Sequence, residues 1–141
     1  MNETMESFAN VVDLLRKTNP QHPVYCIYPH VYRQTVEHFV SGFPGRVLYA
    51  VKANIHPEIL RIFTEAGIHE FDCASLREIE QVRESCPDAT IYFMNPVRFK
   101  GDAKKAQEEF GVRHFLIDHP SGLAPLVDEI DPGNSVIFAR M

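Results

Sequence analysis

The chain has 141 residues, which is enough for one domain with a buried core but too few for two ordinary domains. Apolar residues make up 45% and charged residues 23%, values that are average for a globular protein and argue against intrinsic disorder. The net charge of −5 argues against a nucleic-acid partner, and no apolar run is long enough to predict a membrane span or a secretory signal.

The amino-terminal residues predict a helix, an extended run and a second helix. Apolar side chains at helical spacing mark the first helix: Met5, Phe8, Ala9, Val12 and Leu15. The extended run covers Val24–Tyr28, and the second helix covers Tyr32–Val40.

Short apolar runs then alternate with helix signals. Pro57 is typical of a first helical position, Ser75 and Glu78 fit a capping box, and Gly111 is suited to end a helix. Alternating strands and helices predict parallel strands joined by crossover helices. The expected strands are Arg46–Val51, His69–Cys73, Thr90–Met94, His114–Ile117 and Ser135–Ala139.

A polar residue marks the end of each expected strand, at intervals of 20, 23, 23 and 22 residues: Lys52, Asp72, Asn95, Asp118 and Arg140. This spacing suits the βα units of a barrel or a doubly wound sheet, and no glycine-rich nucleotide motif follows a strand. Because an eight-stranded barrel needs about 250 residues, five strands indicate either an open sheet or part of a barrel. Since the chain ends within the fifth strand, we expect an α/β fold: an incomplete parallel (β/α) barrel of the TIM type, with about five of eight strands and its helices outside.

The strand-end residues are candidates for chemistry, because active sites of βα proteins gather at the carboxyl ends of strands. The alternative is that they are ordinary surface residues. Lys52 is the strongest candidate, since it directly follows the apolar run Val47–Val51. Partial burial there would favour a neutral, nucleophilic amine that can react with an aldehyde, whereas a lysine that extends into water would have no such role.

Three motifs, in order and at matching spacing, are similar to those of a known family: Tyr49–Asn54 (YAVKAN), Phe71–Ser75 (FDCAS) and Asn95–Pro96. The series resembles the amino-terminal half of the pyridoxal-phosphate-dependent decarboxylases of ornithine, arginine, lysine and diaminopimelate, which share the fold-type III barrel with alanine racemase. The resemblance runs from about residue 24 to the end. It implies that residues 24–141 form the amino-terminal portion of the cofactor-binding barrel, truncated here, after a helix and lead-in over residues 1–23.

The resemblance also implies roles for single residues. Lys52 matches the catalytic lysine that holds pyridoxal phosphate covalently, and Asp72 matches an aspartate near the cofactor. Arg140 matches an arginine that faces the cofactor, although an ion pair with a neighbouring carboxylate would explain it equally. Glu78 matches a family glutamate whose presence the capping box already explains.

Several elements of the resembling enzymes have no counterpart in the 141 residues. They are the histidine that stacks on the ring, the glycine-rich phosphate loop, the glutamate that pairs with the pyridine nitrogen, and the carboxy-terminal β-domain. Active sites of the family form between two subunits. We therefore expect a homodimer for the full-length protein and no activity for this chain alone.

The implied function is decarboxylation of a basic amino acid. Ornithine, giving putrescine for polyamine biosynthesis, is the first choice, because FDCAS is closer to ornithine enzymes than the FDVVS of diaminopimelate enzymes. Lysine, arginine and diaminopimelate stay open, and so does a non-catalytic regulator that binds a protein, as antizyme inhibitors do. An alanine racemase is disfavoured because Ile55–Glu58 replaces the expected Tyr-Gly-His-Gly.

The cysteine and histidine patterns predict neither disulfides nor a metal site. Cys26, Cys73 and Cys86 are odd in number and form no CxxC, which indicates reduced thiols in a cytoplasmic protein. His114 and His119, five residues apart, fall on opposite faces of an expected strand. The expected partner is thus a small-molecule substrate, with no metal, nucleic acid or membrane.

Overall fold

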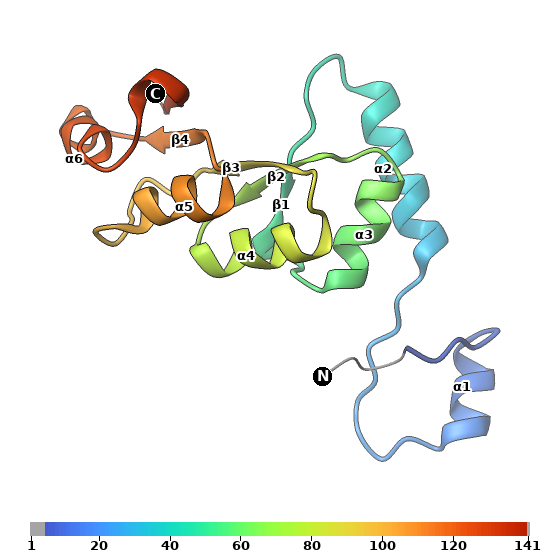
Figure 1. Cartoon of the computed structure of the whole chain (residues 1–141). Coiled ribbons are helices and arrows are strands. Elements are labelled where there is room, and N and C mark those ends of the chain that lie inside the picture. The colour runs from blue at the N-terminus through green and yellow to red at the C-terminus, as the bar shows by residue number, and fades with distance from the viewer. Residues whose placement is uncertain (1–4, 141) are drawn as a thin grey trace.

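The alternating signals fold into one parallel sheet whose strands lie side by side in chain order (Figure 1). The computed structural model describes residues 5–140. The strand order never reverses, which distinguishes the sheet from a doubly wound one and matches a barrel that is partly built. The predicted partial (β/α) barrel is therefore confirmed. Its strands are β1 (Tyr49–Ala50), β2 (Glu70–Cys73), β3 (Thr90–Phe93), β4 (His114–Ile117) and β5 (Val136–Ala139).

The helices begin and end largely where local signals place them. Pro57 occupies the first position of α3, and the Ser75 hydroxyl accepts a hydrogen bond of 3.3 Å from the Glu78 amide at the start of α4. Gly111 ends α5 with a φ of 68°, a conformation that favours glycine. The helices are α1 (Val11–Thr18), α2 (Pro29–Gly42), α3 (Pro57–Glu65), α4 (Leu76–Ser85), α5 (Asp102–Phe110) and α6 (Leu123–Val127).

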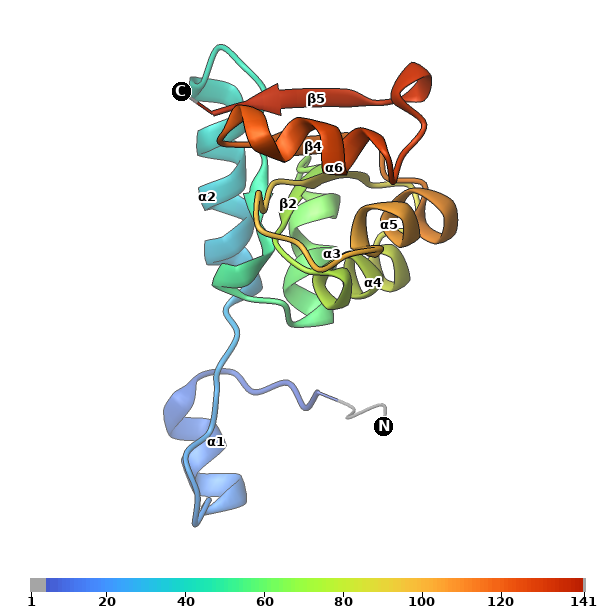
Figure 2. The ribbon, with the colours of Figure 1, turned by 90° about the vertical axis from the view of Figure 1, so that its left-hand side faces the viewer.

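The amino-terminal segment differs from the expectation. The first helix begins at Val11 rather than near Met5, because the Asn10 side chain accepts a hydrogen bond of 3.0 Å from the Asp13 amide and caps the helix there. Helix α1 buries no side chain and lies apart from the sheet and its helices (Figures 1 and 2). The run Val24–Tyr28 belongs to no helix and pairs with no strand of the described chain.

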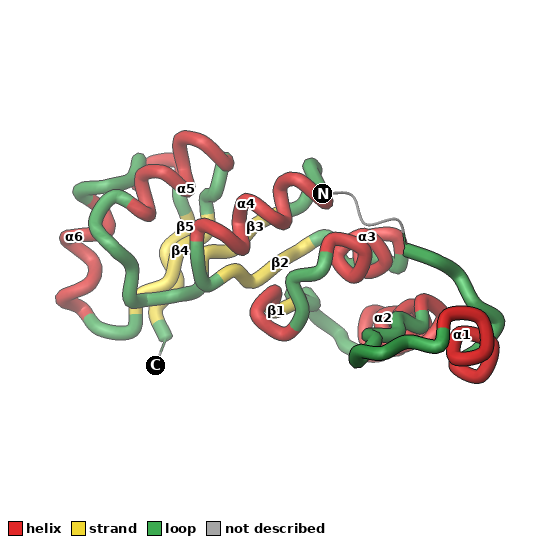
Figure 3. Tube along the Cα trace, turned by 90° about the horizontal axis from the view of Figure 1, so that it is seen from below, coloured by secondary structure: helices red, strands yellow, loops and turns green. Residues whose placement is uncertain are grey.

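The hydrophobic core lies between the helices and one face of the sheet. Figure 3 shows α3, α4 and α5 following the strands along that face. Alternate strand residues point into this layer, as the two-residue period of a strand requires. Among the residues with essentially no exposed surface are Phe71, Phe93, Phe115, Ile59, Leu60 and Ile79.

The opposite face of the sheet is only partly covered within the described residues, since Val136 and Phe138 on it are 49% and 40% exposed. The strand register places one row of this face in the order Ala50, Asp72, Tyr92, His114 and Val136. The Tyr92 ring stacks on His114 with centroids 4.2 Å apart, and Phe138 beside them is 40% exposed. In a closed barrel this face is the filled interior. No helix within residues 5–140 has both the length and the apolarity that a membrane span requires.

Candidate functional site

The parallel strands bring their carboxyl ends to one edge of the sheet, where the predicted residues lie. Lys52 lies in η1 (Val51–Ala53), a single 3-10 turn that directly follows β1. Asp72 is the penultimate residue of β2, and Asn95 comes two residues after β3. Asp118 and Arg140 each follow their strand by one residue. The sequence thus predicted correctly which edge these side chains share.

Lys52 is exposed, so the expectation of a partly buried amine is wrong for this chain. The reason lies in the sheet, because among residues 5–140 β1 has only β2 beside it and so forms an edge of the sheet. The preceding residue, Val51, points into the core and has no exposed surface. The backbone of Lys52 is therefore anchored while its amine stays accessible to a small aldehyde.

Asp72 is half-buried on the open face of the sheet. Burial raises the pKa of its carboxyl, the charge of Glu78 raises this pKa further, and the positive charge of Lys52 opposes both effects. Within residues 5–140 the Asp72 carboxyl makes no hydrogen bond. Its position therefore depends on the backbone at the end of β2.

Two side chains hold the backbone that follows β2. The Ala74 amide donates to Glu78 Oε2 at 2.8 Å, and the Ala74 carbonyl accepts from Asn95 Nδ2 at 3.0 Å. Glu78 therefore serves as the predicted capping residue, although its carboxylate binds the amide one residue before the cap itself. Nothing in the sequence indicated this use of Asn95.

Arg140 and Asp118 form an ion pair at the ends of β5 and β4, with Arg140 Nη2 3.3 Å from Asp118 Oδ2. This pair is the alternative that the sequence left open for Arg140. Both side chains are exposed, so the pair itself adds little stability. Within the described residues no hydrogen bond or ion pair connects Arg140 with Asp72 or Lys52. The edge thus carries two separate pairs of charged side chains: Lys52 and Asp72 after β1 and on β2, and Asp118 and Arg140 after β4 and β5.

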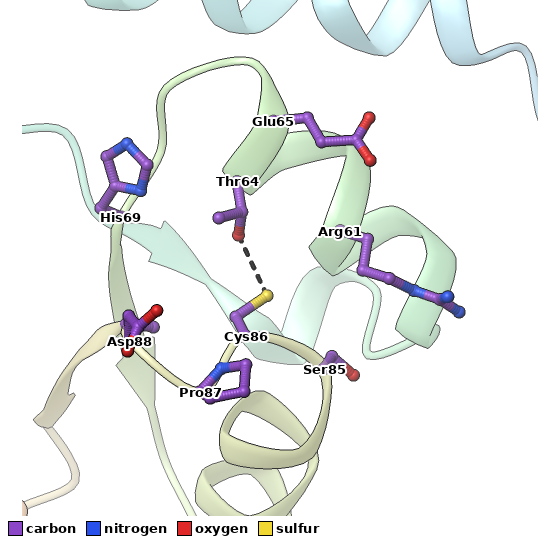
Figure 4. A pocket seen from close by; sticks show the side chains of 9 residues that line it. Arg61, Thr64, Glu65, His69, Ser85, Cys86, Pro87 and Asp88 are labelled. Atoms are coloured by element: carbon purple, nitrogen blue, oxygen red, sulfur yellow. Dashed lines mark hydrogen bonds between the residues drawn. The ribbon is translucent and has the colours of Figure 1, made fainter.

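A hollow among the described residues lies away from this edge (Figure 4). It lies between the end of α3 and the turn that leads into β3, and its lining includes Thr64, His69 and Cys86. The Thr64 hydroxyl donates to Cys86 Sγ at 3.0 Å, and burial raises the pKa of this thiol. Since β2 and β3 begin beside it, the hollow is at the amino ends of the strands, opposite the edge where βα proteins place their sites.

The described residues offer no cluster of three or more histidine, cysteine or acidic side chains that could hold a metal ion. The cysteines are free thiols, with Cys26 exposed and both Cys73 and Cys86 buried. Burial also strongly raises the pKa of Cys73, which keeps it in the unreactive thiol form.

A partial (β/α) barrel with an accessible lysine and a half-buried aspartate at the carboxyl edge defines a barrel domain suited to binding an aldehyde cofactor. The family model of the pyridoxal-dependent decarboxylases, pyridoxal binding domain, matches residues 30–139. The chain belongs to this family, and the resemblance seen in the sequence is confirmed. The cofactor of the domain is pyridoxal phosphate.

Known relatives extend well beyond the length of this chain. A lysine/ornithine decarboxylase of Selenomonas ruminantium is 38% identical over 94 residues, which are 64% of this chain and 23% of that protein. The solved lysine decarboxylase of the same organism superposes with a TM-score of 0.79 at 25% identity, covering 98% of this chain and 35% of its own. The ornithine decarboxylase of Entamoeba histolytica gives 0.70 at 25% identity, with 80% and 33% covered. The chain therefore spans no more than about a third of these proteins.

The residues at the edge fit the cofactor chemically. Pyridoxal phosphate needs a primary amine that can reach its aldehyde, and Lys52 presents an exposed amine on an anchored backbone. The Asp72 carboxyl with its raised pKa lies within electrostatic reach of that amine. Arg140 adds a permanent positive charge at the same edge.

Proposed function

We propose that residues 24–141 are the amino-terminal portion of a pyridoxal-phosphate-dependent enzyme that decarboxylates a basic amino acid. The observation that carries the proposal is the exposed Lys52 at the carboxyl end of β1, inside the YAVKAN motif, in a chain whose residues 30–139 match the family's pyridoxal binding domain. In this proposal residues 1–23 precede the cofactor-binding portion, and α1 lies among them.

Lys52 is the catalytic residue of the proposal, because its amine would hold the cofactor through the aldehyde. When bound, pyridoxal phosphate supplies an electron sink for the electron pair that carbon dioxide leaves behind. Asp72 would bind the cofactor beside Lys52, where burial raises the pKa of its carboxyl. Arg140 supplies a fixed positive charge toward anionic groups, and Asp118 orients its guanidinium.

Ornithine is the substrate we propose, with putrescine for polyamine biosynthesis as the product. The FDCAS segment supports this choice, and so does the likeness to the Selenomonas lysine/ornithine decarboxylase and the Entamoeba ornithine decarboxylase. The FDCAS segment separates ornithine from diaminopimelate and not from lysine, and the matched relatives include enzymes named for either of these two substrates. We further propose that the complete enzyme is a homodimer in the cytoplasm, a location that the free thiols support.

Cofactor binding by three versions of the chain tests the proposal: the unchanged chain, Lys52→Ala and Lys100→Ala. Lys100 is a matched control, because it is also exposed and follows β3 at the same edge of the sheet. We expect the visible absorption of lysine-bound pyridoxal phosphate to develop in the unchanged chain and in Lys100→Ala, and to be largely lost in Lys52→Ala. Equal absorption in all three would contradict the role of Lys52 and favour a non-catalytic protein-binding homologue.

Activity of the chain alone provides a second test. We expect no release of carbon dioxide from ornithine with added pyridoxal phosphate, because the 141 residues contain no glycine-rich loop to bind the phosphate group. Turnover by the isolated chain would overturn the proposal that groups outside these residues complete the site.

A further inference from the structure

The turn that follows β2 depends on side chains for its shape. The last hydrogen bond between β2 and β3 runs from the Met94 amide to the Cys73 carbonyl at 3.0 Å. Beyond it, both backbone groups of Ala74 are bound by side chains, the amide by Glu78 and the carbonyl by Asn95. The backbone two residues after Asp72 is thus fixed by one side chain from α4 and one from the loop after β3.

Asparagine is suited to this position because both ends of its amide are used. Asn95 Oδ1 accepts a hydrogen bond of 3.1 Å from the Val97 amide, which closes a local turn before the chain enters α5. This bond directs Nδ2 toward the Ala74 carbonyl, 3.0 Å away. A serine could keep the first bond but is too short for the second, and an aspartate has no donor to offer a carbonyl.

Arg98 in turn anchors Asn95 to the next strand. Its guanidinium donates to the Asn95 carbonyl and, at 2.8 Å, to the carbonyl of Leu116 in β4. The same group lies 5.7 Å from the centroid of the Phe93 ring and is half-buried, so it is held from several sides. Asn95 and Arg98 therefore connect the carboxyl ends of β2, β3 and β4 through side chains.

We propose that Asn95 is a positioning residue for Asp72: by fixing the turn after β2, it holds the Asp72 carboxyl half-buried beside Lys52 and Glu78. The inference rests on the proposed cofactor-binding role of Asp72 and deepens it. Asp72 makes no side-chain hydrogen bond of its own in residues 5–140, so its backbone sets where its carboxyl lies. That backbone is held by pairing with Ala50 and Tyr92 within the sheet and, after Cys73, by the turn that Glu78 and Asn95 fix. Asn95 does not need to touch substrate or cofactor for this role.

Titration of the Asp72 carboxyl by NMR, without cofactor, tests the proposal in the full chain and in two serine variants. Asn95→Ser keeps an acceptor for Val97 but frees Ala74. Asn134→Ser is the control, because Asn134 is exposed and precedes β5 at the opposite edge of the sheet. We expect Asn95→Ser to lower the pKa of Asp72 toward the ordinary value of a carboxyl as water reaches it, and Asn134→Ser to leave it unchanged.

The stability of each variant, measured by urea unfolding, separates positioning from a purely structural role. An unchanged Asp72 titration in Asn95→Ser would overturn the proposal, whether or not the variant loses stability. If Asn95→Ser fails to fold, Arg98→Lys provides the same readout. The shorter reach of its amine releases either Asn95 or Leu116, and the pKa of Asp72 is again expected to fall, by a smaller amount.

The titration needs no cofactor and Lys52 is unchanged in every variant, so the outcome does not depend on whether Lys52 binds pyridoxal phosphate. A shifted titration in a chain that binds no pyridoxal phosphate would refute the proposed function and leave the positioning by Asn95 standing. Cofactor binding at Lys52 with an unshifted titration would refute the positioning alone.

Discussion

The two faces of the sheet differ in how completely this chain covers them. The helix-covered face is a closed hydrophobic layer in which Phe71, Phe93 and Phe115 have essentially no exposed surface. The other face carries Asp72 near one edge and an aromatic group around Tyr92 in its middle, and parts of it remain open. The side chains of the helix-covered face are buried by this chain alone, whereas the open face presents groups that further residues or a cofactor could contact.

This difference shows that the buried apolar residues stabilise a βα fold, while the polar residues at its strand ends are available for chemistry. Burial of apolar surface stabilises the fold locally, between each strand and the helices that follow it. Polar groups at the carboxyl ends contribute little to folding, and a half-buried carboxyl such as Asp72 even opposes it when charged. Substitutions on the two faces should therefore separate effects on stability from effects on binding.

The largest expected effect is on the free energy of unfolding, when two phenylalanines on neighbouring strands are replaced one at a time. Phe115 on β4 has no exposed surface on the covered face, and Phe138 on β5 is 40% exposed on the open face. We expect Phe115→Ala to lower the free energy of unfolding by about 3–5 kcal/mol, and Phe138→Ala by about 1 kcal/mol. Urea unfolding measures both, and equal losses would show that the two faces do not differ in this way.

The open face should also govern association of the isolated chain. Val136 and Phe138 are 49% and 40% exposed, and β5 pairs with β4 on one side while its other edge has no partner strand within residues 5–140. We expect the chain to self-associate in sedimentation velocity, and Phe138→Asp to shift it substantially toward monomer. Tyr25→Asp is the control, since Tyr25 is 99% exposed but lies before α2, outside the sheet. A monodisperse unchanged chain would contradict the expectation.

A smaller effect is expected from removing the Asp72 charge. Because burial raises the pKa of this carboxyl in the folded chain, its contribution to stability is present below the ordinary pKa and is lost as the pH rises through the raised pKa. Asp72→Asn should therefore leave stability unchanged in acid and increase it at neutral pH, by less than about 1 kcal/mol because solvent screens the half-exposed group.

Urea midpoints of the unchanged chain and Asp72→Asn, measured across this pH range, check the sign. A loss of stability at neutral pH would mean that the Asp72 carboxylate supports the fold. In that case its position at the strand end would need no functional explanation.

Features encoded by neighbouring residues were predictable from the sequence. The strands β2 to β5 lie within a residue or two of their apolar runs, and the Ser75–Glu78 cap forms as expected. The edge shared by Lys52 and Asp72 follows directly from parallel strands in chain order. The family was likewise recognisable, because its motifs lie at strand ends, where spacing is constrained by the fold.

Features that depend on distant parts of the chain were not predictable. The exposure of Lys52 reflects the absence of a strand on the far side of β1, which no local pattern records. The sequence identifies Asn95 only as the polar residue at the end of an expected strand. The folded structure shows that its side-chain amide donates a hydrogen bond to the Ala74 carbonyl. The apolar periodicity predicts a first helix that begins near Met5, but the Asn10 cap makes it begin at Val11.

The most direct test of the central claim is to reduce the chain with borohydride in the presence of pyridoxal phosphate and then to map the modified peptides. Reduction fixes the cofactor on whichever amine holds it. If the open face and its carboxyl edge form the cofactor site, the label should appear on Lys52 ahead of Lys100 and the lysines of α5, and it should vanish from this position in Lys52→Arg. A label spread over the exposed lysines, with Lys52 unmodified or no more modified than the others, would contradict the claim.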